Sequence, residues 1–483
     1  MLFNSFGFAL FLPVVFALYW FVAGKSLKYQ NVILLVASYF FYACWDWRFL
    51  FLLVFSTLLD YFTGIKMSEA GSEKAKKRWF WLSVTVNLGF LGIFKYFNFF
   101  AASMATAMAN VGLHVNPWTL KVILPVGISF YTFHGLSYVI DIYKNRIKAE
   151  RNFIDYSLFV SFFPLLVAGP IERATHLLPQ VKKARTFDYY AAADGLRQIL
   201  WGLFKKAVIA DQCSEFANTI FANSSAYTGS TLVLGAIFFT FQIYCDFSGY
   251  SDMALGIARL FGIDLLRNFA FPYFSRDIAE FWRRWHISLS SWFRDYLYIP
   301  LGGSKGSTWT KVRNTFIIFL VSGFWHGANW TFIAWGLLNA LYIMPSIIFN
   351  TNRVNLQIVA GGRALPSLSD FFQILLTFSL TVFAWIFFRA TSIAHAFSYI
   401  SRIFSRSLFT VPQFEASRAL VFATLILIAA FLIIEWNGRE HQYAIATLGK
   451  LEKESYRYAF YFSLLLTIYL FMGREQQFIY FQF

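Results

Sequence analysis

The chain has 483 residues, of which 58% are hydrophobic and only 14% charged, and its mean hydropathy is +0.54. A soluble domain usually carries about 25% charged residues, so this chain has too little polar sequence to cover a water-facing surface. The net charge of +16 is better explained by cytoplasmic loops and anionic lipid than by nucleic acid. The three cysteines show neither a disulfide pattern nor the spacing of a zinc site.

Apolar runs recur along the chain at about 17–22 residues, the length that a helix needs to cross a bilayer. Examples are residues 8–22 with their flanks, 80–100 and 371–388. Hydropathy predicts about ten to twelve such spans. No Lys or Arg precedes Lys25, so the first run lacks the basic region of a cleaved signal peptide and is expected to remain as a helix. We therefore expect an all-α polytopic integral membrane protein.

Basic and near-neutral loops alternate over the first third of the chain. Residues 25–28, 66–78 and 144–151 are basic, whereas 45–48 is near neutral and 101–119 contains no Lys or Arg. Because basic loops remain in the cytoplasm, this alternation predicts an N-terminus on the outside.

The segment 153–169 is apolar but short, contains Pro164 and has basic residues on both sides. Equal charge at both ends predicts that it enters and leaves on one face of the membrane. Such a re-entrant segment requires protein to bury its backbone. The next pair of interest, Lys205 and Lys206, interrupts an apolar run and must snorkel or face the interior.

Residues 238–313 are rich in Arg, Trp, Tyr and Asp, although they lie between two strongly apolar regions. Apolar side chains recur there every three to four residues, which predicts an amphipathic helix at the membrane face. They are Phe281, Trp285, Leu289 and Trp292. Residues 314–350 are then apolar for longer than one crossing needs and are interrupted at 322–329. A bent or broken pair of half-helices is expected there.

Two of the seven histidines lie in polar sequence at or beside the membrane. His326 lies between small residues in an apolar region, with Ser322 and Asn329 near enough to orient its ring. A neutral imidazole there could act as a general base for a hydroxyl group, or it could be a hydrogen-bonded packing residue. His286 follows Arg283 and Arg284, a grouping that suits a phosphate or, equally, anionic lipid.

Two further polar clusters favour structural roles. Asp246 and Asp252 are interpreted as ion-pair members, and Cys245 has no base beside it in the sequence. His134, Tyr138 and Asp141 form one polar stripe on a predicted helix. Such a stripe faces the protein interior, where it joins helices or lines a tunnel.

Taken together, these motifs resemble the membrane-bound O-acyltransferase (MBOAT) family, in particular its bacterial branch of alginate O-acetyltransferase membrane subunits. The resemblance is carried by the run from Trp282 to Gly303 (Trp-Arg-Arg-Trp-His-Ile-Ser-Leu-Ser) and by Gly323-Phe-Trp-His-Gly-Ala-Asn-Trp330. Shorter matches start at Leu124, Phe162 and Tyr244, and the ends of the chain also fit, so the resemblance covers essentially the whole sequence.

The resemblance implies a single transmembrane domain over residues 1–483, with N-terminal helices at 1–152, a catalytic core at 153–350 and C-terminal helices at 351–483. It implies a funnel of helices around a tunnel and assigns catalysis to His326 and His286. On the same grounds we expect the substrate-binding residues to be Arg283, Arg284, Trp325, Asn329, Asp246 and Tyr250. No metal and no bound cofactor is expected.

The expected reaction moves an acyl group, most simply acetyl, from a cytoplasmic thioester to a hydroxyl of a cell-surface polysaccharide. The donor would be acyl-coenzyme A or an acyl carrier protein, and a separate extracytoplasmic transferase is an expected partner. The expected location is the bacterial inner membrane. The alternatives are D-alanyl or peptidoglycan acyl transfer by the same fold, or a polysaccharide or lipid transporter, in which broken helices also occur.

Overall fold

The computed structural model describes residues 1–24, 26–120, 123–414, 417–450, 453–472, 476 and 478–479, and within them the secondary structure is helical, with no strand. The chain forms two compact units. Unit 1 comprises Met1–Ala192 and Ile257–Leu266, and unit 2 comprises Ala193–Gly256 and Arg267–Phe483. The fold is therefore all-α, as predicted.

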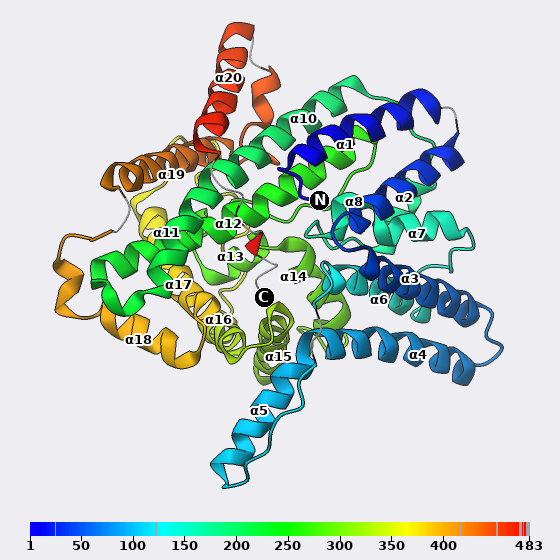
Figure 1. The fold of residues 1–483 in the computed structure, drawn as a ribbon, viewed down its shortest axis with the longest axis horizontal. Coiled ribbons are helices and arrows are strands. Elements are labelled where there is room, and N and C mark those ends of the chain that lie inside the picture. Colours follow the sequence, from blue (N-terminus) through cyan, green and yellow to red (C-terminus); the bar gives the residue numbers. More distant parts are fainter. Residues whose placement is uncertain are drawn as a thin grey trace. The chain divides into compact units, whose positions relative to one another are not determined.

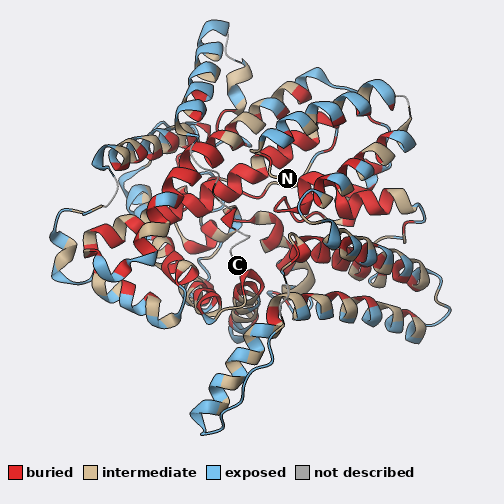
Figure 2. Cartoon of the chain, in the orientation of Figure 1, coloured by how far each residue is buried: buried red, intermediate tan, exposed pale blue. Residues whose placement is uncertain are grey.

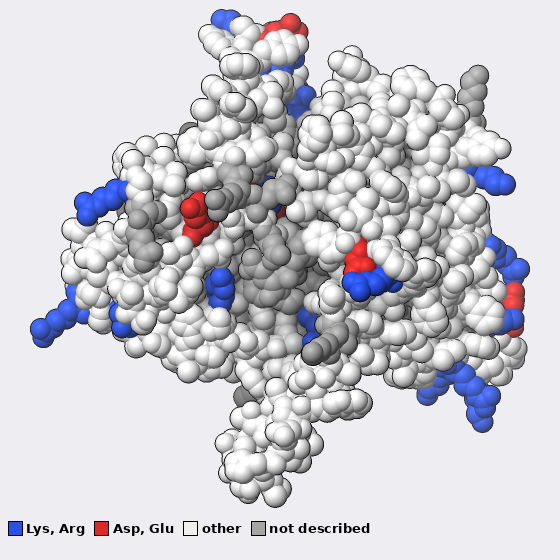
Figure 3. Space-filling view, in the orientation of Figure 1, with Lys and Arg blue, Asp and Glu red and all other residues white. Residues whose placement is uncertain are grey.

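Six helical segments of the described chain are long and apolar enough to cross a membrane. They are Trp47–Ser68, Glu73–Asn110, Gly229–Leu260, Trp330–Ile348, Leu368–Arg389 and Arg418–Gly438. The predicted count of ten to twelve is not confirmed, because other apolar runs form shorter helices, such as Phe6–Val22, or broken ones. Few Lys, Arg, Asp and Glu side chains are visible on the face shown in Figure 3, in keeping with the low charged content of the chain.

Unit 1 contains the first nine helices (Figure 1). They are α1 (Phe6–Ala17), α2 (Leu27–Ala43), α3 (Trp47–Ser68), α4 (Glu73–Leu91), α5 (Phe97–Asn110), α6 (Ile128–Tyr143), α7 (Phe153–Ser161), α8 (Phe163–Leu166) and α9 (Ala174–Val181). Helices α3, α4 and α6 pack on one another around the buried Asp60. Its carboxylate accepts hydrogen bonds from Ser83 at 2.6 Å and Asn87 at 2.8 Å, so a polar group is satisfied between apolar helices.

The polar stripe of α6 joins this helix to the chain around it. The Nε2 atom of His134 accepts a hydrogen bond from the backbone N–H of Glu172 at 3.1 Å. The hydroxyl of Tyr138 accepts one from the N–H of Glu150 at 2.9 Å, and Asp141 pairs with Arg146 at 2.9 Å. The stripe therefore connects elements of unit 1. Of the two roles that the sequence leaves open, joining helices and lining a tunnel, these contacts support the first.

The segment predicted to be re-entrant is indeed not one straight helix. Helix α7 ends at Ser161, Phe162 has non-helical dihedral angles, and α8 covers only four residues. Every residue of both helices from Asp155 onward is buried. Protein thus covers this broken backbone, while its predicted re-entry into the membrane stays a prediction.

Unit 2 is built around α12. Its helices are most of α10 (Tyr189–Phe204), α11 (Asp211–Ala222), most of α12 (Gly229–Leu260), α13 (Ile278–Arg284), α14 (Ile287–Phe293), α15 (Thr308–His326), α16 (Trp330–Ile348), α17 (Leu368–Arg389), α18 (Ile393–Ile403), α19 (Arg418–Gly438) and α20 (Glu454–Phe471). In α12, 83% of the apolar window is buried, against 28–39% in the other five segments. Figure 2 shows the same contrast, so α12 belongs to the protein core and the other segments keep a face for lipid.

Buried ion pairs lie where α10 continues into the π-helical turn η3 (Lys205–Ala210). Lys205 is 2.5 Å from Asp252, and Lys206 is 2.8 Å from both Asp211 and Asp246. Both lysines face the interior, and both aspartates of α12 are ion-pair members, as the sequence predicts. Asp246 also accepts a hydrogen bond from the N–H of Ile479 at 2.7 Å, which holds this part of the C-terminal chain in unit 2.

The prediction of an amphipathic helix through residues 281–292 is wrong in detail. The segment forms two short helices, α13 and α14, separated at Trp285 and His286. The apolar residues of the predicted stripe are 2–7% exposed, so they pack inside the protein rather than against lipid. The apolar period correctly predicted helical structure, but it predicted neither the break at residues 285–286 nor the residues against which the stripe packs.

The broken pair at residues 314–350 is confirmed. Helix α15 ends at His326, and α16 begins at Trp330 with Asn329 as its N-cap. The two helices lie with their backbones in close contact: a Cβ atom at Gly323 would lie 2.3 Å from the carbonyl oxygen of Phe332, and one at Gly336 would lie 2.3 Å from that of Phe319. Only glycine permits this approach.

Candidate active site

His286 lies at the break between α13 and α14, in a left-handed backbone conformation with φ of 42°. Such a conformation costs a non-glycine residue about 1–3 kcal/mol and persists only where the surroundings fix it. The side chain is 1% exposed, and its ring lies edge-on to Phe247 with centroids 4.6 Å apart. Burial lowers the pKa of His286 to about 3, so the imidazole is neutral at physiological pH.

Asn268 fixes the backbone beside this histidine. Its carbonyl oxygen accepts a hydrogen bond from the N–H of Ile287 at 2.9 Å, and its side-chain oxygen accepts one from Ser288 at 2.6 Å. Its side-chain nitrogen donates to Ser251 of α12 at 2.9 Å. Asn268 is 1% exposed. It therefore connects the start of α14 to the core helix of unit 2.

His326 is the last residue of α15, and its side chain is 5% exposed. Three aromatic rings surround the imidazole: Trp325 at 4.9 Å, Trp335 at 5.1 Å and Phe388 at 5.3 Å between centroids. Trp325 also lies 6.0 Å from the ring of His286. One indole thus lies close to both histidines.

Both histidines line one cavity of about 150 Å³ in unit 2. The remaining lining residues are mostly apolar: Trp282, Trp285, Leu289, Ser290, Phe293, Ile318, Phe319 and Ser322. A mainly apolar cavity with a few converging polar groups is the usual form of a small-molecule site. Two imidazoles in such a cavity can transfer a proton and donate a hydrogen bond to a reacting group.

The other residues expected to bind substrate lie outside the lining of this cavity. Arg283 donates to the carbonyl oxygens of Asn352 and Asn355, and Arg284 pairs with Glu280 at 2.7 Å. Asn329 caps α16 and donates to the carbonyl oxygen of Thr391 at 3.0 Å. The remaining three are Trp325, which contacts both histidines, Asp246, which pairs with Lys206, and Tyr250, whose ring lies 5.3 Å from Phe478.

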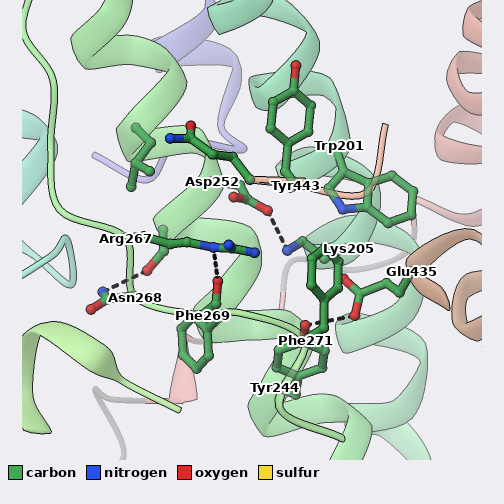
Figure 4. A pocket seen from close by; sticks show the side chains of 13 residues that line it. Trp201, Lys205, Tyr244, Asp252, Arg267, Asn268, Phe269, Phe271, Glu435 and Tyr443 are labelled. Carbon is green, nitrogen blue, oxygen red and sulfur yellow. Dashed lines mark hydrogen bonds and ion pairs between the residues drawn. The ribbon is translucent and has the colours of Figure 1, made fainter. Parts of the chain in front are cut away.

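A second, polar pocket of unit 2 adjoins the Asn268 contacts (Figure 4). It contains the ion pair of Lys205 with Asp252 and the hydrogen bond from the hydroxyl of Tyr244 to Glu435 at 2.7 Å. The guanidinium of Arg267 bonds to the carbonyl oxygen of Phe269 and points into the same pocket. This network joins η3, α12, α19 and the chain before α13. No metal-binding group of His, Cys, Asp or Glu is present in the described part of the chain.

The sequence reading missed Asn268, Glu435 and the aromatic wall formed by Trp282 and Phe319. Asn268 gave no distinct signal, because it directly follows Arg267 in a stretch that also contains Asp264. Its contacts join residues about twenty positions apart, so no local pattern could have identified them.

Comparison with known proteins identifies the family of the chain. The model of the membrane-bound O-acyltransferase family matches residues 144–388, a range that contains both histidines. The protein belongs to this family. The Pseudomonas aeruginosa protein called "Probable alginate O-acetylase AlgI" is 39% identical over 437 residues, covering 90% of this chain and 80% of its own length.

The names of two less similar relatives refer to other polymers. The peptidoglycan O-acetyltransferase of Helicobacter pylori is 37% identical, covering 82% of this chain and 78% of its own. The teichoic acid D-alanyltransferase of Bacillus subtilis is 30% identical over 45% of this chain and 57% of its own. The chain is accordingly a multi-pass membrane O-acyltransferase.

Proposed function

We propose that this acyltransferase moves an acetyl group from a cytoplasmic thioester donor to a hydroxyl of a cell-surface polysaccharide. The observation that carries the proposal is the cavity lined by both His286 and His326. The names of the relatives, O-acetylases of alginate and of peptidoglycan, support the acetyl group and the polysaccharide acceptor.

In the proposed reaction His326 acts as the general base. Its imidazole takes the proton of the acceptor hydroxyl while the oxygen attacks the thioester carbonyl carbon. The carbon–sulfur bond then breaks, and the departing thiolate receives the proton from the imidazolium. One ester forms and one thiol is released, so no metal, oxidant or reductant is needed. A base in this position contributes about 10²–10⁴ in rate.

His286 is proposed to hold the thioester carbonyl. A neutral imidazole has one N–H donor, which can stabilise the negative charge that develops on the carbonyl oxygen. The low pKa of His286 supports this role, since a group with a pKa of about 3 neither removes nor supplies a proton at neutral pH. The two histidines would thus have different tasks in one cavity.

The finer assignments extend the same proposal. The donor is an acetyl thioester of coenzyme A or of an acyl carrier protein, and the protein resides in the bacterial inner membrane. Transfer occurs to the polysaccharide or through a separate extracytoplasmic transferase. Peptidoglycan is the second candidate acceptor, favoured by the relative from H. pylori. D-alanyl transfer is less favoured, because the relative that performs it matches 45% of this chain.

The test measures the O-acetyl ester content of the surface polysaccharide in cells with wild-type protein or His326→Ala. We expect at least a 100-fold loss of ester at equal protein levels in the membrane. His441→Ala is the matched control, because His441 is exposed and lies outside the cavity. Unchanged ester in both His326→Ala and His286→Ala would reject acyl transfer at this site and favour a transporter, which does not need a proton acceptor at position 326.

A further inference from the structure

Part of the lining of the histidine cavity is aromatic, and further contacts hold it in position. The rings of Trp282 and Phe319 meet edge to face with centroids 5.2 Å apart. The indole N–H of Trp282 donates to Asn339 at 3.3 Å, and Asn339 is itself held by the carbonyl oxygen of Trp335 at 2.8 Å. The Trp282 ring is thereby fixed in position as well as packed.

The backbone of α15 behind these aromatic residues is packed directly against α16. Phe319 lies on α15, and its carbonyl oxygen is in contact with Gly336 of α16, where even a Cβ atom would be 2.3 Å away. One turn later, Gly323 makes the same kind of contact with Phe332. Close-packed interiors do not expand to admit extra methylene groups without cost. The volume of the cavity is therefore set by the side chains that line it.

That volume suits a short acyl group. A cavity of about 150 Å³ lined by Leu, Ile and Phe holds a molecule of the size of benzene, and the present cavity has the same size. An acetyl group, its thioester sulfur and the carbon and oxygen of the acceptor hydroxyl together have about six non-hydrogen atoms, as many as the benzene that such a cavity holds. Each added methylene group exceeds this size, so the side chains of the lining would have to move to admit a propionyl or butyryl chain beside the acceptor.

We propose that Phe319, supported by Trp282, determines the acyl length that this enzyme transfers. The acyl chain points from the reacting carbonyl toward the Phe319 ring, which accepts a methyl group and excludes longer chains. This inference rests on the proposed function, because it concerns the acyl group held beside His326. It adds a residue that sets specificity without taking part in proton transfer.

The experiment compares the short-chain acids released from the surface polysaccharide of cells grown with propionate or butyrate, which raise the corresponding acyl thioesters. Wild-type protein is expected to yield acetyl esters almost alone. Phe319→Ala removes the ring and is expected to raise the butyryl-to-acetyl ratio at least 10-fold, since a methylene in a fitted pocket changes selectivity about 10- to 200-fold. The matched control is Phe316→Ala, one turn earlier on α15 and absent from the cavity lining.

Two further variants keep the test decisive if Phe319→Ala does not accumulate in the membrane. Leu289→Ala enlarges the same cavity from α14 and should shift the ratio in the same direction, and Leu289→Phe should lower acetyl transfer. Butyryl transfer by wild type equal to acetyl transfer would overturn the inference, as would an unchanged ratio in the enlarged variants. Loss of the proposed function gives a different result, namely acetyl ester that does not depend on His326.

Discussion

At the scale of single residues, the position of His286 depends on a residue outside its own motif. The left-handed backbone at His286 is followed directly by two hydrogen bonds to Asn268, one from the N–H of Ile287 and one from Ser288. Both helices beside the histidine are only seven residues long. Because such short helices have little stability of their own, the Asn268 contacts stabilise the backbone that positions the His286 ring, which itself packs against Phe247 and Trp325.

We therefore predict that Asn268→Ala lowers acyl transfer about 10- to 100-fold, because small displacements of a reacting group cost about this much. The change removes the hydrogen bonds that the Asn268 side chain makes with two buried hydroxyls, those of Ser251 and Ser288. Asn268→Asp keeps an oxygen for Ser288 and should retain more activity. The measurement is ester content at matched protein level.

The control for this prediction is Asn223→Ala. Asn223 is exposed, and its side-chain nitrogen donates a hydrogen bond at 3.3 Å to the carbonyl oxygen of Thr219 in α11. Ester formation at the wild-type level in Asn268→Ala would show that α14 holds His286 without this residue.

At the scale of elements, the active-site cavity depends on the close pairing of α15 and α16. Gly323 and Gly336 place each backbone against the other, and His326 follows at the end of α15. Side-chain packing is the main source of helix association in a membrane, and small residues allow the closest packing. A change that separates the two helices should therefore move the cavity wall and His326 together.

Gly336→Ala is the direct test of this pairing. The added Cβ would meet the carbonyl oxygen of Phe319, so the helices must shift, at a cost of about 1–3 kcal/mol. We expect a lower melting temperature of the purified protein and reduced ester formation. Gly89→Ala on α4 should be neutral or slightly stabilising, since nothing lies within 4 Å of its Cβ position. Equal melting temperatures for the two variants would contradict the prediction.

These elements also show how far the sequence can be read. The break between α15 and α16 was predictable because a polar, glycine-containing motif interrupts an apolar run that is too long for one span. The break at His286 was not, since the apolar period continues through it from Phe281 to Leu289. Two backbone hydrogen bonds between segments remote in sequence flank the break, one from the N–H of Ile287 to Asn268 and one from the N–H of Ala270 to Arg284.

The same limit applies to the candidate site. Both histidines carry family motifs and line the cavity, whereas the sequence assigns no task to Trp282, which begins one of these motifs, and Phe319 reads as an ordinary apolar residue. The arginines beside His286 have the charge expected of a phosphate site, and in the structure they bond to carbonyl oxygens and to Glu280. Charge in a sequence predicts that partners exist but not which ones they are.

At the scale of the whole molecule, the distribution of basic residues predicts on which side of the membrane each end of a helix lies. The segment Glu73–Asn110 has 38 residues and bends at the π-helical turn η2 (Gly92–Tyr96), between α4 and α5 (Figure 1). Helix α4 alone has 19 residues and is about 28 Å long, close to the ~30 Å of a bilayer core. The segment starts at a loop rich in Lys and Arg and ends in a stretch without them, so we expect its two ends on opposite sides of the membrane.

This orientation can be tested with single cysteines in a Cys44→Ser background, because Cys44 is exposed and the other two cysteines are buried. His114→Cys lies beyond the end of α5, and Gly71→Cys lies in the basic loop, with nothing within 4 Å of its Cβ. Since basic loops stay in the cytoplasm, a membrane-impermeant maleimide should label position 114 on intact spheroplasts and position 71 only after permeabilisation. The reverse pattern would place the basic loops outside. It would also reverse the side from which a cytoplasmic thioester could reach the histidines, so the labelling tests the direction of the proposed acyl transfer as well as the topology.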